Sequence, residues 1–340
     1  MAEIIQLSEN RRDTQDALDR LQKHFTDELV KVEQTITDHM SSAASLVPEI
    51  SGHIVGAGGK RLRPLLTLSA ARLSGYQGDK QIMLAAAVEF MHTATLLHDD
   101  VVDDSDMRRG KPTARKIWGN PASVLVGDFL LGQAFRMMVT TGSLAALSTL
   151  STAAAIIAEG EVMQMAALQN VQISEDNYLQ IIEAKTAALF AAAAEVGGIV
   201  ANAPEAEIEA LKSFGRNLGI AFQLVDDALD YGSVGQVLGK NTGADFREGK
   251  ITLPFILAFH RGDDETRAFW QRIAAAESLP DKDDFNRAVE EMHRTGALRD
   301  TVARAAHYGE KARDALGLFK TGETRQLMTE LVDFCIARAY

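Results

Sequence analysis

Cysteine, proline and aromatic residues are all scarce in this chain of 340 residues. Its one cysteine, Cys335, excludes an intrachain disulfide framework, and this suits a reducing compartment such as the cytoplasm. Only seven prolines are present, whereas hydrophobic residues make up 46% of the chain and alanine is abundant. Because alanine loses no side-chain entropy in a helix and proline breaks the backbone ladder, the composition predicts a globular protein built of long helices.

Basic residues are outnumbered. The chain has 35 Lys and Arg against 47 Asp and Glu, which gives a formal charge of -12. A nucleic-acid backbone would be repelled by this excess, so no nucleic-acid partner is expected. An acidic chain that binds an anionic substrate needs divalent cations or a local group of basic residues.

Long apolar runs are also missing. The most apolar segment, 187–203, is short, rich in alanine and interrupted by Glu195, so it predicts a buried core helix. The N-terminus has no basic region followed by an apolar stretch, and no signal peptide is expected. We therefore expect a cytoplasmic protein, for which peripheral contact with a membrane remains open.

Apolar residues recur at helical spacing along most of the chain. Within residues 1–45 a stripe predicts one amphipathic helix, at positions 18, 21, 25, 29, 32 and 36. Further helices are predicted over 80–104, 122–140, 143–169, 174–201 and 205–230. Glycine-rich loops are predicted at 52–64 and 232–250, and Pro254 should open another helix. Without strand alternation or a short repeat, a single all-α domain over 1–340 is the simplest prediction.

Two acidic clusters of the form DDxxD end predicted helices. The first contains Asp99, Asp100 and Asp103. A step of four residues turns only about 40° beyond one revolution, so Asp99 and Asp103 share a face. Carboxylates on one face suit Mg²⁺, which binds a few carboxylates together with water and phosphate oxygens.

The second cluster lies about 130 residues later and contains Asp226, Asp227 and Asp230, with Gln223 on the same face. Either cluster alone could be a solvated acidic helix end. Both, however, follow apolar helical runs. Two such helix ends facing each other would hold a diphosphate between metal ions, which favours metal-assisted diphosphate chemistry.

A basic loop complements the acidic clusters. Residues 58–64 read Gly-Gly-Lys-Arg-Leu-Arg-Pro, and Lys60 and Arg63 suit a second diphosphate that needs no metal. A single basic residue is more often a solvated surface charge. These residues indicate phosphate binding only in combination with the acidic clusters. The further candidates for phosphate contact are Arg108, Arg109, Lys185, Thr186, Lys240 and Lys250.

Five segments carry a family resemblance: the basic loop at 58–64, residues 92–103, Arg-Arg-Gly-Lys-Pro-Thr at 108–113, Phe-Gln-Leu-Val-Asp-Asp at 222–227, and residues 239–250. Over about residues 50–340 the chain resembles the trans-polyprenyl diphosphate synthases, and most of all the bacterial octaprenyl and decaprenyl enzymes. The resemblance implies an all-helical fold around a deep central cavity, a homodimer, and three Mg²⁺ ions in each active site.

The resemblance also implies residue roles. Asp99, Asp103 and Asp226 are expected to bind metal, and Asp100, Asp227 and Asp230 complete the two catalytic clusters together with Lys185. The isopentenyl diphosphate site is expected to contain Lys60, Arg63, His92 and Arg109. The allylic diphosphate is expected to contact Arg108, Lys185, Thr186 and Gln223. Lys240 and Lys250 are further candidates in the loop predicted at 232–250, which is named the flap.

The implied reaction ionises an allylic diphosphate, farnesyl or geranylgeranyl, and joins the cation to isopentenyl diphosphate. Ala94 and Thr95 are small where short-chain members of the family carry aromatic residues. The resemblance therefore points to a long all-trans product, octaprenyl to decaprenyl, for the side chain of a quinone. A shorter geranylgeranyl product is the alternative within the family.

Other readings explain less of the sequence. Glu89 with His92 and Glu290 with His293 fit the Glu-x-x-His spacing of di-iron helical bundles, but this leaves both acidic clusters and the basic loop unused. A terpene cyclase would carry a different second metal motif. A non-catalytic subunit would lack one acidic cluster, whereas both are intact here.

Overall fold

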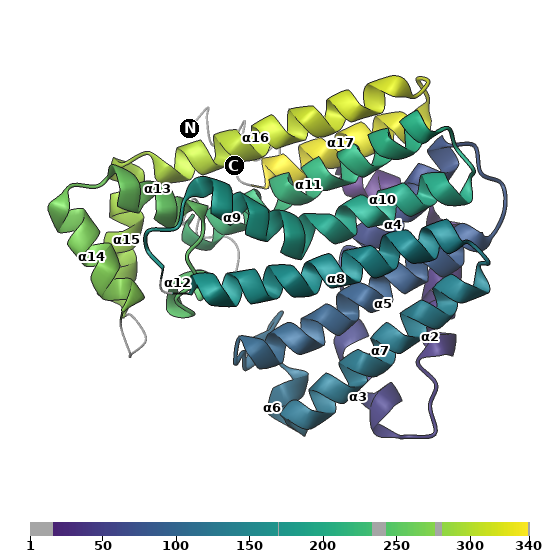
Figure 1. Ribbon diagram of the computed structural model, residues 1–340, viewed down its shortest axis with the longest axis horizontal. Helices are drawn as coiled ribbons and strands as arrows, with labels where there is room; N and C mark the ends of the chain where they lie inside the picture. The colour runs from purple at the N-terminus through teal and green to yellow at the C-terminus, as the bar shows by residue number, and fades with distance from the viewer. Residues whose placement is uncertain (1–15, 169, 233–242, 276–280, 339–340) are drawn as a thin grey trace.

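The computed structural model describes residues 16–168, 170–232, 243–275 and 281–338, and it is helical almost throughout (Figure 1). Residues 16–24 are helical. The elements up to the middle of the chain are α2 (Thr26–His39), α3 (Leu46–Val55), α4 (Leu62–Leu73), α5 (Lys80–Val102), β1 (Met107–Arg108), β2 (Lys111–Pro112), α6 (Ala114–Trp118), α7 (Asn120–Thr140) and α8 (Leu144–Ala167).

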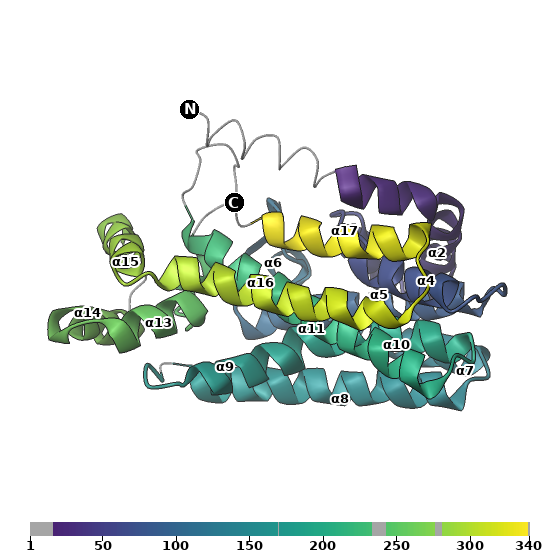
Figure 2. The same ribbon diagram turned by 90° about the horizontal axis from the view of Figure 1, so that it is seen from above.

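The second half continues with α9 (Glu175–Ile182), the π-helix η1 (Glu183–Ala187), α10 (Ala188–Val200), α11 (Glu205–Tyr231), α12 (Ala244–Arg247), α13 (Leu253–Arg261), α14 (Asp264–Ala274), α15 (Lys282–Arg294), α16 (Ala297–Ala315), the 3₁₀ turn η2 (Leu316–Leu318) and α17 (Glu323–Ala337). Figure 2 shows α10 and α11 between α8 on one side and α16 with α17 on the other. Helices α14 and α15 project from one end. The predicted all-α fold is confirmed.

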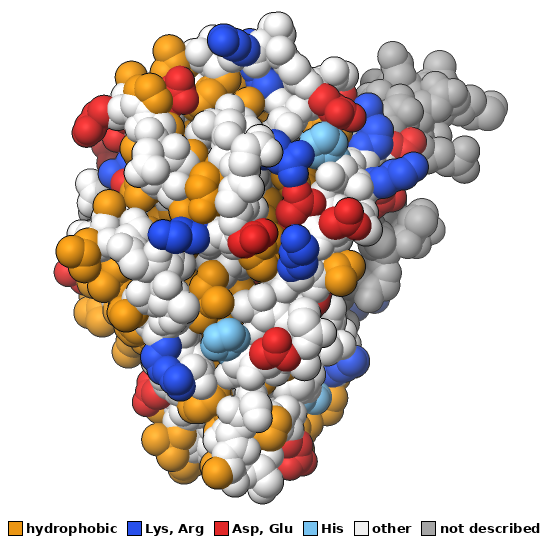
Figure 3. All heavy atoms as spheres, turned by 90° about the vertical axis from the view of Figure 1, so that its right-hand side faces the viewer, with side chains coloured by type: hydrophobic (Ala, Val, Ile, Leu, Met, Phe, Trp, Pro, Cys, Tyr) orange, Lys and Arg blue, Asp and Glu red, His pale blue; other side chains and the backbone are white. Residues whose placement is uncertain are grey.

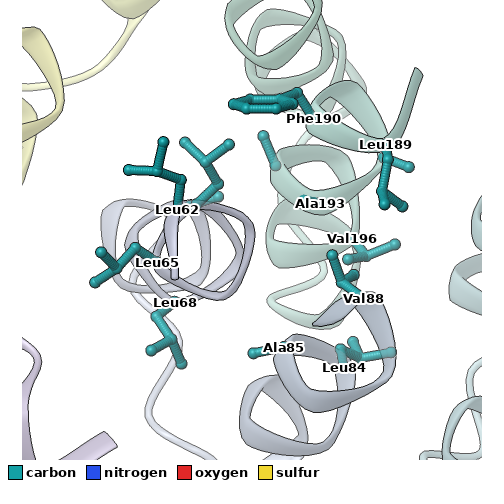
Figure 4. Packing of buried hydrophobic residues seen from close by; sticks show 14 of the residues in the cluster. Leu62, Leu65, Leu68, Leu84, Ala85, Val88, Leu189, Phe190, Ala193 and Val196 are labelled. Atoms are coloured by element: carbon teal, nitrogen blue, oxygen red, sulfur yellow. The ribbon is translucent and has the colours of Figure 1, made fainter. Parts of the chain in front are cut away.

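Helices α4, α5 and α10 pack together in the main core. Figure 4 shows α4 beside α10, with Val88 of α5 next to Val196 of α10. A Cβ atom on Gly197 of α10 would lie 2.6 Å from the Cβ of Ala70 in α4, so only glycine permits this close approach. The tight packing fixes α5 and α10, whose ends carry candidate functional residues.

A second buried cluster lies around the C-terminal end of α11. Tyr231, Phe246 and Trp270 are among its largest members, and they join α11 and α12 to α13 and α14. Phe246 contacts both other rings, at centroid distances of 6.4 Å to Tyr231 and 6.5 Å to Trp270. The end of α11, which bears the second acidic cluster, is therefore held by aromatic packing.

Most helix predictions are confirmed to within a few residues, and Pro254 does lie in the first turn of α13. Several details were wrong. The loop predicted over 232–250 contains the short helix α12. The loop predicted from residue 52 begins later, because α3 continues to Val55. The predicted N-terminal helix is interrupted at Phe25, where the chain turns before α2, although Phe25 is buried as its place in the apolar stripe requires.

The apolar segment 187–203 is a core helix as predicted, since most of α10 is buried. Among the described residues, length and composition would instead allow α7 to cross a membrane, and 44% of its apolar window is buried. The exposed surface mixes residue types, as on the face in Figure 3, where acidic, basic and hydrophobic side chains alternate. That the whole chain forms one domain stays a prediction.

Candidate active site

The first acidic cluster lies where α5 ends. Asp103 caps the helix, and its backbone N–H donates to the carbonyl of Asp99 at 2.8 Å. The Asp103 carboxylate accepts a hydrogen bond from Lys250 Nζ at 2.8 Å, and Lys185 Nζ lies 4.0 Å from Asp99. Burial raises the pKa of Asp99, and the neighbouring Asp103 raises it further against the opposing Lys185. These two carboxylates share a face, as the spacing predicts.

Asp100 points elsewhere. It is 1% exposed and accepts a hydrogen bond from Arg108 Nε at 2.8 Å. Arg108 belongs to a two-stranded hairpin in which Arg109 and Gly110 have φ of 52° and 76°, as a tight turn of the I′ type requires. The Asp100–Arg108 pair therefore ties this hairpin to the end of α5.

Lys185 and Thr186 lie in the π-helix between α9 and α10, where the sequence pattern predicts regular helix. A Cβ atom on Gly160 of α8 would lie 2.8 Å from the backbone nitrogen of Lys185, so α8 is pressed against the π-helix. Lys185 Nζ donates to Glu161 at 2.9 Å and to Gln164 at 2.7 Å, both on α8. π-helical turns are common at functional sites because they redirect side chains out of helical register.

A hydrogen-bonded chain connects the π-helix to the second acidic cluster. Thr186 Oγ1 donates to Gln223 Oε1, and Gln223 Nε2 donates to Asp227 Oδ1, both at 2.9 Å. The hydroxyl of buried Tyr178 donates to the other oxygen of Asp227. Burial raises the pKa of Asp227 to about 7, although both hydrogen bonds oppose the shift.

The other two aspartates of this cluster have separate partners. Asp226 accepts a hydrogen bond from Arg338 Nη2 at 2.6 Å, just beyond α17. Asp230 accepts the backbone N–H groups of Ala244 at 3.0 Å and Asp245 at 2.9 Å, which places it at the N-terminus of α12. An anionic side chain stabilises a helix N-terminus, so Asp230 also anchors the part of the flap that forms α12.

The described part of the flap, residues 243–250, contacts both acidic clusters. Burial raises the pKa of Asp245 to about 8, with Asp230 and Asp227 adding to the shift. Lys250 bonds to Asp103 on α5, and burial would lower its pKa, but Asp103 and Glu248 outweigh burial and raise it. A cavity of about 120 Å³ is lined by Lys185, Thr186, Gln223, Asp227, Asp245 and Lys250 together with apolar residues of α9. Lys240 lies outside the described residues.

Four side chains, Lys60, Arg63, His92 and Arg109, form a basic group that is named the basic pocket. Arg63 and Arg109 both act on His92, and Asp226 of the second acidic cluster attracts Arg63. The Nε atom of Arg63 is buried without a hydrogen-bond partner, and its guanidinium lies 4.6 Å from the ring centre of Phe190. Burial lowers the pKa of Arg63 to about 10, and Arg109 adds to this effect. Burial, followed by Arg63 and Arg109, holds the pKa of His92 well below its usual range, so His92 is neutral near pH 7.

The surplus of positive charge indicates an anion site. Lys60 Nζ lies 4.6 Å from the ring centre of Phe334 in α17, at the edge of the same pocket. A Cβ atom on Gly59 would lie 3.1 Å from Arg109 Nη1, so the missing side chain lets Arg109 approach the loop. The pocket thus gathers donors that suit an anionic group such as a diphosphate.

The acidic side chains fit a hard cation chemically. Burial raises the pKa of Glu161, Asp99 and Asp230, and neighbouring carboxylates add to the shift for Glu161 and Asp99, so a bound cation would lower the cost of these buried charges. Among the described residues no three acidic, histidine or cysteine side chains lie close enough to hold a metal ion. Instead Lys185, Lys250 and Arg338 lie against the predicted ligands Asp99, Asp103 and Asp226.

A sequence model described as polyprenyl synthetase matches residues 44–292, which is most of the chain. The chain belongs to this family. It is 42% identical over 321 residues to the octaprenyl diphosphate synthase of Escherichia coli, covering 94% of this chain and 99% of that protein.

Solved structures of the polyprenyl synthetase family agree closely with the fold. A decaprenyl diphosphate synthase from Rhodobacter capsulatus superposes with a TM-score of 0.91 at 47% identity, covering 95% of this chain and 99% of that one. A polyprenyl synthase from Caulobacter crescentus, complexed with calcium and isoprenyl diphosphate, gives 0.91 at 50% identity, covering 95% and 98%. The prediction that the chain is an enzyme of this family is confirmed.

The structure also accounts for the residues behind the di-iron alternative. Glu89 is 6% exposed and bonds to Arg61 at 2.6 Å, so it is already paired with a cation. Glu290 and His293 lie on α15, in the end that projects from the bundle. Membership of the polyprenyl synthetase family leaves no role for a di-iron centre.

Sequence reasoning missed several residues that the fold brings to the site. Glu161, Gln164, Tyr178, Asp245 and Arg338 each contact or face a predicted residue. Glu161 and Gln164 are three residues apart on the inner face of α8, a spacing that could have indicated one shared face. The contact of Arg338 with Asp226 spans 112 residues and leaves no local signal.

Proposed function

We propose that this enzyme extends an allylic diphosphate with isopentenyl diphosphate and makes a long all-trans polyprenyl diphosphate, octaprenyl to decaprenyl. The observation that carries the proposal is the presence of two kinds of anion site: helix ends that gather carboxylates, and a group of basic side chains in which Arg63 Nε is buried without a partner. Two diphosphates can then bind side by side, one through metal ions and one through arginine and lysine.

At the acidic site, Asp99 and Asp103 of α5 and Asp226 of α11 would hold Mg²⁺, three ions in each site. Bound Mg²⁺ neutralises the allylic diphosphate as its carbon–oxygen bond breaks. Because Arg338 donates to one oxygen of Asp226, metal binding at Asp226 would compete with this ion pair. Thr186 and Gln223 present polar oxygens beside Lys185, on the side where the allylic cation forms.

At the basic pocket, Arg63, Arg109, Lys60 and neutral His92 would bind isopentenyl diphosphate. Its double bond attacks the allylic cation to form the new carbon–carbon bond. A proton then leaves the adjoining carbon to regenerate an allylic double bond, and the released pyrophosphate accepts it. The reaction needs no nucleophilic side chain.

The direct test is to incubate the enzyme with isopentenyl diphosphate, farnesyl or geranylgeranyl diphosphate, and Mg²⁺, and to size the dephosphorylated products by chromatography. We expect octaprenyl to decaprenyl alcohols, and no product when EDTA removes the metal. A product that stops at geranylgeranyl would support the shorter-chain alternative. Failure to consume isopentenyl diphosphate would overturn the proposed function.

Product length is expected to depend on α5 one turn before Asp99. Ala94 is 1% exposed, and Thr95 is partly buried with its hydroxyl bonded to the carbonyl of His92 at 2.8 Å. We predict that Ala94→Phe shortens the main product by several isoprene units, because the ring fills the space that the growing chain needs. Chromatography of the products measures this.

Because Ala94 is fully packed, its phenylalanine variant risks a loss of stability of about 1–3 kcal/mol. Thr95→Phe, at the less buried neighbour, therefore serves as the second variant. A product of wild-type length from both folded variants would remove this segment from chain-length control.

We further propose that the enzyme acts as a homodimer through the outer surface of α7 and α8. Apolar side chains are exposed there, with Leu125 66%, Leu144 81% and Val162 65% accessible. Exposed apolar side chains along both helices suit a second copy of the chain. Sedimentation equilibrium should give twice the mass of the 36.9 kDa chain, and a monomer at micromolar concentration would contradict the proposal.

The long apolar tail of the product favours contact of the enzyme with a membrane when the product is released. We propose a cytoplasmic enzyme that touches a membrane peripherally when it releases the product, which would supply the side chain of a quinone. Co-sedimentation with phospholipid vesicles, with and without bound product, tests the membrane contact. Equal recovery of the enzyme in the supernatant in both cases would speak against it.

A further inference from the structure

Arg61 adopts a conformation that arginine rarely takes. It lies between Lys60 and Arg63 in the basic loop, and its backbone has φ of 50° and ψ of 37°, in the left-handed region. An L-residue with a Cβ atom is disfavoured there, so the surroundings must hold it in place. The residue is also the N-cap of α4, so its conformation fixes how the loop enters that helix.

Two carboxylates from different helices hold the Arg61 side chain. Its Nε donates to Glu33 of α2 at 2.7 Å, and its Nη1 donates to Glu89 of α5 at 2.6 Å. The Arg61 side chain is only 16% exposed. The side chains of Glu33 and Glu89 are 46% and 8% exposed. A planar guanidinium between two carboxylates is a directional contact that lysine does not reproduce.

A second contact from the N-terminal helices supports the same loop. Gln22 Nε2 donates to the backbone carbonyl of Lys60 at 3.2 Å. Both Gln22 and Glu33 precede residue 44, where the match to the family begins. The N-terminal helices therefore reach the basic pocket although they contribute no residue to it.

Glu89 has a further effect on the pocket. Its carboxylate attracts Arg61, Arg63 and Arg109. A buried negative charge among these guanidinium groups reduces their mutual repulsion before any anion binds. It thus keeps the cations together in the free enzyme.

We propose that Arg61, clamped between Glu33 and Glu89, is a positioning residue that holds the basic loop in the conformation that binds the diphosphate of the second substrate. The inference rests on the proposed function, in which Lys60 and Arg63 bind isopentenyl diphosphate. The clamp joins α2 and α5 across the loop, and it acts on this substrate and not on the allylic one.

The test is Glu33→Gln, which keeps the size of the side chain and removes its charge. We expect the KM for isopentenyl diphosphate to rise on the order of tenfold, because a charge-assisted hydrogen bond that fixes the loop is weakened. The KM for the allylic diphosphate should stay within twofold of wild type. Glu28→Gln is the matched control, because Glu28 pairs with Arg72 and also joins α2 to α4, at the far end of α4 from the loop.

The control separates positioning from general stability. Both variants weaken the contact of α2 with α4, so a purely structural role predicts equal losses of thermal stability and equal kinetics. Positioning predicts that only Glu33→Gln changes the KM for isopentenyl diphosphate. Equal KM values for this substrate in the two variants would contradict the positioning role of Arg61.

Arg61→Gly provides an independent measurement. Glycine accepts the left-handed backbone without strain but cannot bind the carboxylates. We expect its KM for isopentenyl diphosphate to rise as in Glu33→Gln, and the double variant to show no further increase. If the KM of Arg61→Gly for isopentenyl diphosphate equals that of the wild-type enzyme, the positioning role of Arg61 is wrong. If wild-type enzyme turns over and only the variants fail these expectations, the clamp is wrong; if wild-type enzyme does not turn over, the proposed function itself is wrong.

Discussion

Asp99→Asn is expected to lower turnover by on the order of 10³-fold, because it removes one full charge from the site where diphosphate charge must be neutralised. Asparagine has nearly the same shape as aspartate, so the end of α5 should keep its structure. Burial raises the pKa of Asp99 although Lys185 opposes the shift, so the folded enzyme bears a cost for this buried charge. An uncharged amide removes that cost, and thermal stability should be unchanged or slightly higher.

Asp104, five residues after Asp99, provides a matched control. Asp104 follows the same helix end, but its side chain is 84% exposed and pairs with Arg115, away from Asp99. Asp104→Asn should therefore retain near wild-type turnover, because an exposed ion pair contributes only about 0–1 kcal/mol. Steady-state rates at saturating Mg²⁺ measure both variants. Turnover by Asp99→Asn within tenfold of wild type would contradict a metal-binding role for this residue.

Local sequence signals predicted the helices well. The spacing of Asp99 and Asp103 placed both carboxylates on one face, and Pro254 correctly opened α13. These predictions succeed because periodicity, caps and prolines act within one or two turns of the helix they describe. Family resemblance supplied the roles of the basic loop, which spacing alone did not assign.

Features that depend on contact between distant segments could not be predicted in this way. The π-helix around Lys185 forms where Gly160 of α8 presses on its backbone, and the Arg61 clamp needs Glu33 and Glu89 from separate helices. Glu89 shows the difficulty plainly. Its Glu-x-x-His spacing suggested iron, whereas the fold pairs it with arginine, because spacing within one helix says nothing about the opposing helix.

Arg63→Met is expected to abolish most activity and yet to stabilise the free enzyme. Arg63 carries a buried Nε without a partner, and burial lowers its pKa to about 10. The group remains charged in the folded and unfolded states at pH 7, so the folded state bears the cost of burying it at every pH below about 10. An unsatisfied buried donor costs about 1–3 kcal/mol, which methionine would recover while still packing against Phe190.

Activity should move in the opposite direction. Loss of a buried charge that pairs with substrate costs about 2–5 kcal/mol of binding, so we expect kcat/KM for isopentenyl diphosphate to fall by on the order of 10²-fold or more. Inorganic pyrophosphate should raise the melting temperature of wild type more than that of Arg63→Met, since a ligand stabilises only the state that binds it.

Arg72→Met is the matched control for this pair of effects. Arg72 lies on the same helix and also faces a phenylalanine, with its guanidinium 5.6 Å from the ring centre of Phe25, but it pairs with Glu28 at the surface. Its replacement should lower stability slightly and leave kcat/KM unchanged. If Arg63→Met instead destabilised the free enzyme as Arg72→Met does, the buried guanidinium would be a structural group, and its missing partner could not be the second diphosphate.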